Sequence, residues 1–265
     1  MKISLEAVLL DSAGSVIALV QPPAERALRA AAARALRRDM PQIERAAFLT
    51  EPRQGEDVRV EPPDGAFDAD VLRCAGYAQA LWRGETGKCL VMAACGGLSE
   101  ALPVVADPAQ GTASAVMPLP EDARALPWAY RAAFAGGVWY VIEDGADEAL
   151  LRRAVQAEPD APLVGAAFFD RGTGAIRPVV FLRASGEYRE LRSSAAGSAA
   201  AAMMRASELR DGITEIGVGQ RGGNLEVGVR TEGGRVTGLS VGGPVRQLET
   251  VRFFVDEEPD GRENV

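Results

Sequence analysis

Hydrophobic and polar positions alternate along the first 20 residues, and one short polar turn interrupts the alternation. Residues 3–20 predict a strand, a turn and a strand, because VIALV is β-rich and the DSAGS turn before it contains a permissive glycine. The next run, PPAERALRAAAARALRR, has proline in its first turn and strong helix formers after it, so it predicts a helix. Short strands at 46–49 and 57–60 follow, and then a second helix that begins at Cys74.

The second half of the chain repeats this order of segments. Residues 134–156 correspond to residues 11–36, VGAAFF corresponds to ERAAFL, and LRSSAAGSAAA corresponds to LRCAGYAQA. Self-similarity at about half of the chain length indicates duplicated domains. Near the C-terminus, residues 213–245 alternate in β fashion between Gly-Gly turns and predict a hairpin or meander. The proline-rich stretch 119–128 is the candidate domain boundary.

The amino-acid composition excludes several classes of function and catalytic mechanism. The chain has 265 residues, a formal net charge of -8 and no histidine. The acidic balance argues against nucleic-acid binding, which needs a basic surface. The lack of histidine excludes Ser-His-Asp and Cys-His catalysis and histidine-ligated zinc. The cysteines are three, Cys74, Cys89 and Cys95, and because this number is odd at least one is a free thiol; they also lack the CxxC spacing of a redox or metal pair.

Two predicted helix starts carry the candidate chemistry. Cys74 would gain from the partial positive charge and open amides of a helix N-terminus, which lower a thiol pKa. Ser194, or its neighbour Ser193, takes the matching place in the second half, and a serine there also serves as an ordinary N-cap. Small residues follow both positions, Ala75 and Gly76 in the first half and 195–198 in the second. Amides that small side chains leave uncovered can bind a carboxylate.

These segments resemble the cofactor-independent racemases and epimerases of the diaminopimelate epimerase type. DSAGSVIALV, GAFDADVLRCAGYAQALW, FAGGVWYVIEDG, SSAAGSAAA and QRGGNLEVGV carry the resemblance, which spans nearly the whole chain in order. It implies an α/β (α+β) fold with two pseudo-symmetric domains, each a curved mixed or antiparallel sheet wrapped around a central helix. The expected domains are 1–120 and 121–250, and a strand within 251–265 would return to the first domain. Substrate would lie in the cleft between the domains.

The resemblance also implies the chemistry and the residues that perform it. Two thiols on opposite faces of the α-carbon of an amino acid remove and donate a proton, and neither pyridoxal phosphate nor a metal takes part. By position, Cys74 would be one acid/base and Ser194, or alternatively Ser193, would stand at the other. Substrate-binding positions would be Ser12, Ser15, Ala75, Gly76, Ala195, Ala196, Gly197, Ser198 and Gln220.

The sequence departs from the family pattern at the second acid/base. A serine hydroxyl is a far poorer base than a thiolate, and no histidine is present to activate it. Three explanations are open: a one-base dehydration or double-bond shift, a protein that binds without reacting, and a serine introduced in place of cysteine. The pair that clamps the diaminopimelate side chain has no counterpart near Glu187 and Arg189, so a true diaminopimelate epimerase is not expected.

We therefore expect an isomerase that takes a free amino acid or a related carboxylate. Nucleic acid and membrane are not expected partners, and whether the chain forms a homodimer is open. The N-terminal residues do not resemble a signal peptide, and no window reaches the roughly 18 apolar residues of a membrane span, so the expected compartment is the cytoplasm.

Overall fold

The computed structural model describes residues 2–21, 25–143, 145, 148–208 and 210–256. Its elements in the first half are β1 (Lys2–Ser12), β2 (Ser15–Val20), a 3-10 turn η1 (Arg26–Leu28), α1 (Arg29–Asp39), β3 (Ile43–Thr50), β4 (Val58–Glu61), α2 (Ala69–Trp82), β5 (Cys89–Cys95), β6 (Leu102–Asp107) and β7 (Thr112–Met117).

The elements of the second half are β8 (Asp122–Leu126), β9 (Ala129–Phe134), β10 (Gly137–Glu143), α3 (Glu148–Ala157), β11 (Leu163–Asp170), β12 (Ala175–Leu182), β13 (Glu187–Glu190), α4 (Ala195–Met204), a 3-10 turn η2 (Arg205–Glu208), β14 (Gly212–Gln220), β15 (Gly223–Glu232) and β16 (Arg235–Asp256). The strand-turn-strand at the N-terminus and the C-terminal meander are as predicted.

The two halves have the same topology. An antiparallel hairpin, β1–β2 or β9–β10, is followed by a helical crossover to a parallel strand, β3 or β11. A second helical crossover, α2 or α4, then leads to another parallel strand, β5 or β14. The internal repeat predicted from the sequence is thus present in the strand order, and the α/β class and the pseudo-symmetric arrangement are confirmed.

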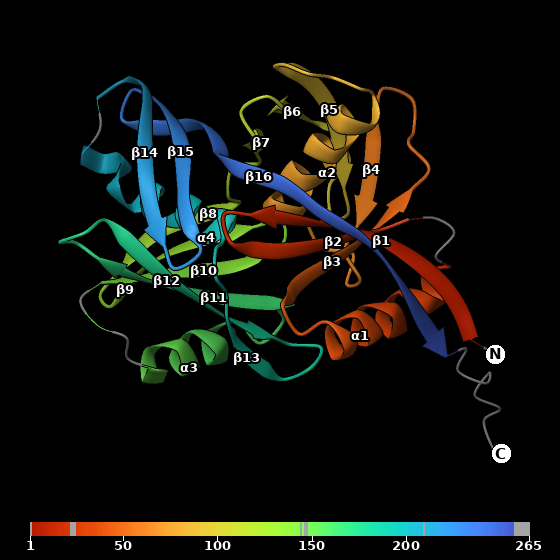
Figure 1. Cartoon of the computed structure of the whole chain (residues 1–265). Coiled ribbons are helices and arrows are strands. Elements are labelled where there is room, and N and C mark those ends of the chain that lie inside the picture. Colours follow the sequence, from red (N-terminus) through yellow and green to blue (C-terminus); the bar gives the residue numbers. More distant parts are fainter. Residues whose placement is uncertain (1, 22–24, 144, 146–147, 209, 257–265) are drawn as a thin grey trace, which may run out of the picture.

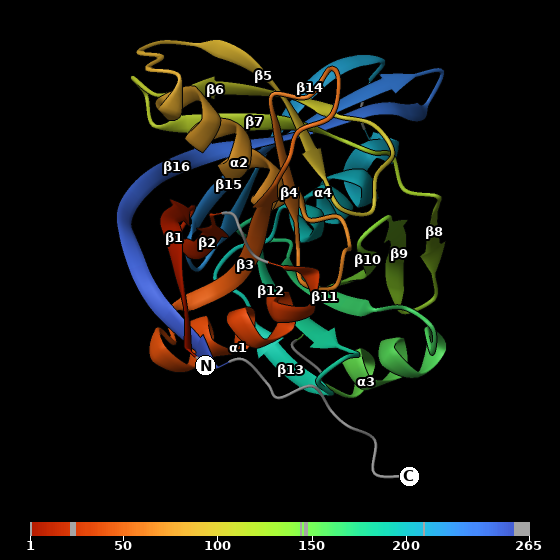
Figure 2. The same ribbon diagram turned by 90° about the vertical axis from the view of Figure 1, so that its right-hand side faces the viewer.

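One continuous sheet of 16 strands passes through both halves. The long strand β16 joins them, because it pairs in turn with β15, β7 and β1. Its last part, 247–256, lies antiparallel to β1, so the C-terminal strand returns to the first half. In Figure 1 and Figure 2 β16 runs from the β14–β15 region across to the N-terminus.

The sheet curves around the two central helices. α2 contacts β4–β7 and α4 contacts β9–β12 and β14–β16, and side chains of both helices belong to one hydrophobic cluster. α4 is enclosed on nearly every side, which explains its small residues, since the buried run 199–202 is four alanines. α1 and α3 cover two smaller clusters on the outer side of the sheet (Figure 1). Among the described residues, no helix is long and apolar enough to span a bilayer.

Candidate functional site between the central helices

The two central helices begin in the same way at equivalent places in the repeat. Asp68 caps α2, and its carboxylate accepts hydrogen bonds from the amides of Asp70 and Val71. Ser194 caps α4, and its hydroxyl accepts a hydrogen bond from the amide of Gly197. Both capping residues have extended backbone conformation, which is typical of an N-cap. The structural counterpart of Ser194 in the first half is therefore Asp68.

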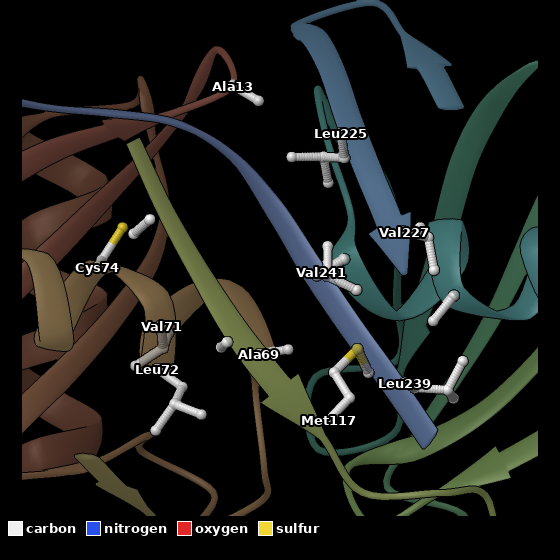
Figure 3. Close-up of a cluster of buried hydrophobic side chains, with 14 of the residues drawn as sticks. Ala13, Ala69, Val71, Leu72, Cys74, Met117, Leu225, Val227, Leu239 and Val241 are labelled. Carbon is white, nitrogen blue, oxygen red and sulfur yellow. The ribbon is translucent and has the colours of Figure 1, made fainter. Parts of the chain in front are cut away.

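The prediction that a helix begins at Cys74 was wrong. α2 begins five residues earlier, at Ala69, and Cys74 lies in its second turn. Its side chain is completely buried and belongs to the hydrophobic cluster drawn in part in Figure 3, and the side chains of Ser12 and Arg73 also interact with it. Burial raises the pKa of the Cys74 thiol to about 12, although Arg73 opposes this shift. The thiol thus lacks both the exposure and the lowered pKa on which the predicted acid/base role depends.

The two small residues after Cys74 do not form an open helix start either. Ala75 is fully buried within α2. A Cβ atom on Gly76 would come within 2.6 Å of the Val104 side chain, so this glycine permits close packing of α2 against β6. The amides of Ala75 and Gly76 lie inside α2 and not at its exposed start.

Buried charges connect the starts of the two helices. Asp70, in the first turn of α2, is 2% exposed and accepts a 2.8 Å hydrogen bond from the amide of Ala195 in the first turn of α4. The same carboxylate lies 3.5 Å from Arg73 and 3.4 Å from Arg45. Arg45 also forms a 3.0 Å ion pair with Asp68. A buried carboxylate needs such partners, because an unpaired buried charge costs several kcal/mol.

Three of the predicted serines belong to this network. Ser12 is fully buried and accepts a 2.5 Å hydrogen bond from Arg73, while its carbonyl oxygen accepts one from the hydroxyl of Ser193. Ser15 is also fully buried, accepts a hydrogen bond from Arg45 and donates one to Glu44. The structure thus gathers these serines where the two halves meet, and there they hold arginine side chains.

The remaining predicted residues lie around the start of α4. Gln220 accepts a 2.7 Å hydrogen bond from the amide of Ser194 and donates one to the hydroxyl of Ser198. Gly197 packs against Trp139, where a Cβ would come within 2.8 Å of the indole ring. The amide of Ala196 has no acceptor among the described residues, and neither does the amide of Ala69 at the start of α2.

A cavity of about 550 Å³ lies where the two helix starts meet. Asp68 and Ser194 both line it, together with Ala69, Asp70 and Ala196, and the Asp68 side chain keeps 29% of its surface exposed. The Cys74 and Ser193 side chains do not border it. A larger recess of about 810 Å³ lies near the end of α4 and contains none of the predicted site residues.

Asp68 has the electrostatics of a group that can exchange a proton. Burial raises the pKa of its carboxyl above the usual value, the ion pair with Arg45 opposes the rise, and the charge of Asp70 adds to it. A carboxyl in a cleft with a raised pKa is a typical acid/base candidate, because proton transfer is most efficient when the pKa approaches the working pH.

The sequence reasoning missed Asp68, Asp70 and Arg45. One signal for Asp68 was available, since FDADVL places an aspartate immediately before a run of helical period, which is an N-cap signature. The match between LRCAGY and LRSSAAG concealed it, because that alignment shifts the helix start. Nothing local marks Arg45, which reaches the site from β3 only through the fold.

The chain matches no protein-family model, and no curated protein is similar to it in sequence. Solved structures share its fold. A predicted epimerase from Pseudomonas aeruginosa has a TM-score of 0.68 at 15% identity, covering 93% of this chain and 98% of that one. A phenazine biosynthesis protein of the PhzF family from Bacillus anthracis has a TM-score of 0.65 at 11% identity, covering 95% and 99%.

A hydroxyproline epimerase from Agrobacterium vitis, with bound trans-4-hydroxy-L-proline, has a TM-score of 0.64 at 16% identity, covering 96% of this chain and 94% of that one. Such coverage of both chains means that the likeness extends over both halves. The chain therefore shares its fold with these structures, and this agrees with the fold expected from the sequence.

Proposed function

We propose that the chain is a cofactor-independent isomerase of small carboxylic acids, in which Asp68 takes a proton from a carbon atom of the substrate and returns it. The observation that carries this proposal is that Asp68 and Ser194 cap the two central helices at equivalent positions and border the same cavity. The shared fold with two structures described as epimerases supports it.

A single base fits these two groups better than a pair of bases does. The Asp68 carboxylate can accept a proton, whereas the Ser194 hydroxyl has no neighbouring histidine to activate it. When the carbon–hydrogen bond breaks, its electron pair moves toward the adjacent carboxyl or carbonyl group. Asp68 then returns a proton, either the one it took or one its carboxyl has exchanged with water, to that carbon or to a neighbouring one. Return to the same carbon gives a substrate whose hydrogen has been exchanged with the solvent. Return to a neighbouring carbon gives an isomer with a shifted double bond.

Negative charge develops on the substrate oxygens during this step. The amides of Ala69 and Ala196 lie at the two helix starts without an acceptor, and both residues line the cavity. Amides held in this way stabilise developing charge without reorganising, and the helix dipoles add to the effect. We assign the reacting carboxylate of the substrate to this end of the cavity.

Hydrogen–deuterium exchange tests the proposal. The chain is incubated in heavy water with L- and D-amino acids and with small unsaturated acids, and deuteration at carbon is followed by NMR. Asp68→Asn is the decisive variant, because asparagine still caps α2 but cannot accept the proton. We expect it to slow exchange by about 10²- to 10⁴-fold. Cys74→Ala is the matched control and should retain the exchange rate.

The expected pH profile follows from the raised pKa of Asp68. The rate should fall as the pH drops through this raised pKa, because the protonated carboxyl cannot act as a base. Asp68→Asn should remove this dependence. If Asp68→Asn still exchanges deuterium at the parent rate, Asp68 is not the base. If neither the parent chain nor Ser194→Cys exchanges deuterium with any of the acids, the chain is not an isomerase of these acids.

A second function, binding without reaction, is favoured by one specific observation. Asp70 occupies the amide of Ala195, and Arg45 is shared between Asp70 and Asp68. Carboxylates of the chain itself thus engage groups that could otherwise contact an acidic ligand. Binding of a carboxylic acid that Asp68→Asn leaves unchanged, with no exchange in the parent chain, would support this function.

A further inference from the structure

The cavity between the central helices carries two arginines that its buried network does not use. Arg37 lies in the last turn of α1 and Arg189 lies in β13, so each half of the chain contributes one. Both side chains line the cavity. α1 and β13 are neighbours in both Figure 1 and Figure 2, although about 150 residues separate them in the sequence.

These two guanidinium groups are close enough to repel each other. Burial lowers the pKa of Arg37, the positive charges of Arg189 and Arg34 lower it further, and Glu187 opposes them. Glu187 is itself 59% exposed and is bonded to Arg189 at 3.2 Å. One exposed carboxylate therefore faces more than one positive charge, and water screens much of its attraction.

The donors of Arg37 lack an acceptor within the part of the chain that the structure describes. Among the described residues, no hydrogen bond or ion pair engages its guanidinium group, and no acidic side chain of the cavity pairs with it. Arg189 donates only a 3.4 Å bond to the carbonyl oxygen of Glu44 besides its bond to Glu187. A partly buried guanidinium group offers five donors, and leaving them without acceptors is costly.

The other two arginines of the cavity differ in this respect. Arg45 is paired with Asp68 and Asp70. Arg183 donates to main-chain carbonyl oxygens at the end of α3 and in the loop that follows it. A position near the C-terminus of α1 would by itself favour a positive charge such as Arg37, because of the helix dipole. That effect does not account for a second arginine placed beside it from the other half.

We propose that Arg37 and Arg189 form a subsite for a second anionic group, a carboxylate or a phosphate, on the ligand of this cavity. Guanidinium groups bind both kinds of oxyanion through paired hydrogen bonds, and an anion between the two arginines would relieve their repulsion. The inference rests on the proposed function for the place of the first carboxylate, near Ala69 and Ala196. It makes the ligand a small dianionic acid held by both halves.

Calorimetric titration of the full chain tests the subsite without relying on turnover. Glutarate and valerate have the same carbon chain and differ in the second carboxylate, and 3-phosphonopropionate supplies a phosphorus oxyanion. We expect glutarate or 3-phosphonopropionate to bind at least about tenfold more tightly than valerate. Arg37→Gln and Arg189→Gln should each reduce this preference to about threefold or less.

Two further variants serve as controls. Arg38→Gln removes an exposed arginine of α1 that pairs with Asp39 and does not line the cavity, so it should retain the preference. Arg37→Lys keeps the positive charge but loses the two parallel guanidinium donors. We expect its preference for the dianions over valerate to lie between those of the parent chain and Arg37→Gln. Thermal unfolding of every variant verifies that the chain remains folded.

The outcomes separate this inference from the proposed isomerase. A preference for the dianions that Arg37→Gln and Arg189→Gln leave unchanged would overturn the subsite, and so would equal or undetectable binding of all three acids. If the preference is present and both variants abolish it, the subsite stands even when no acid exchanges deuterium. Exchange of monocarboxylates without any preference would retain the isomerase and reject the subsite.

Discussion

The carboxylate of Asp70 accepts a 2.8 Å hydrogen bond from the amide of Ala195, and this bond connects the first turn of α2 to the first turn of α4. The bond puts an acidic side chain of the protein at a helix N-terminus where an acidic ligand was expected to bind. The Asp70 carboxylate also neutralises part of the positive charge of Arg45, which reaches it from β3, and of Arg73, which lies in α2. Asp70 thus holds the two halves together beside the cavity.

Removal of this carboxylate should be severely destabilising. Asp70→Ala leaves Arg73, which is completely buried, without its only acidic partner among the described residues. We expect the free energy of unfolding, measured by urea denaturation, to fall by about 3–5 kcal/mol. Asp39→Asn is the matched control, since Asp39 is exposed and pairs with Arg38, and it should leave the free energy of unfolding nearly unchanged. Equal effects of the two variants would show that the buried network does not join the halves.

The three cysteines should differ in their reaction with iodoacetamide. Cys74 and Cys95 are completely buried, and burial raises the pKa of each thiol to about 12, so neither should be alkylated in the folded chain at pH 8. Cys89 is partly exposed and should react slowly, because burial raises its pKa as well. Peptide mapping by mass spectrometry measures each site, and unfolded chain provides the reference. Rapid labelling of Cys74 in the folded chain would restore it as a candidate base.

The sequence predicted much of the fold because its signals there are local. Alternation in β1 and β2 and the strong helix formers of α1 identify the first repeat, and similar patterns identify β10 and α3 in the second. The site was harder to predict, since it depends on the register of one helix. A helix start placed at Cys74 selects a buried thiol as the candidate acid/base, whereas the actual start at Ala69 selects a partly exposed carboxylate, that of Asp68. Arg45 and the proximity of Arg37 to Arg189 could not have been predicted, because only the folded chain brings β3, α1 and β13 to the cavity.

Gly136 should be essential for the shape of the cavity wall. It lies in the turn between β9 and β10, and a Cβ atom there would come within 1.9 Å of the carbonyl oxygen of Phe67, next to Asp68. Main-chain atoms cannot rotate away from such a contact as a side chain can. We expect Gly136→Ala to lower the free energy of unfolding by about 1–3 kcal/mol and to weaken binding of carboxylic acids.

Gly87→Ala is the control for that variant, because a Cβ atom on Gly87 would meet nothing within 4 Å. Its stability should stay within about 0.5 kcal/mol of the parent chain. Urea denaturation and calorimetric titration of both variants give the comparison. If Gly136→Ala binds and unfolds like Gly87→Ala, the tight contact between the turn and the loop before α2 is absent in solution.

The hydroxyl of Tyr140 should stabilise the folded chain at neutral pH and lose this effect at alkaline pH. Its hydroxyl donates a 2.7 Å hydrogen bond to Glu158, and burial, followed by the bond to Glu158 and the charge of that group, raises the pKa of Tyr140 to about 12. An unfolded chain loses this proton near pH 10. The stabilisation from the neutral hydroxyl is therefore fully present below about pH 10 and is lost as the pH rises toward 12.

Tyr140→Phe removes this hydroxyl and should lower the free energy of unfolding by about 2 kcal/mol at pH 7, because the bond it deletes goes to a charged acceptor. The difference from the parent chain should shrink as urea denaturation is repeated between pH 9 and pH 11. Tyr188→Phe is the control, since Tyr188 is half exposed, and it should show neither effect. A difference for Tyr140→Phe that stays constant over this pH range would mean that the Tyr140 proton is held no more tightly in the folded chain than in the unfolded one.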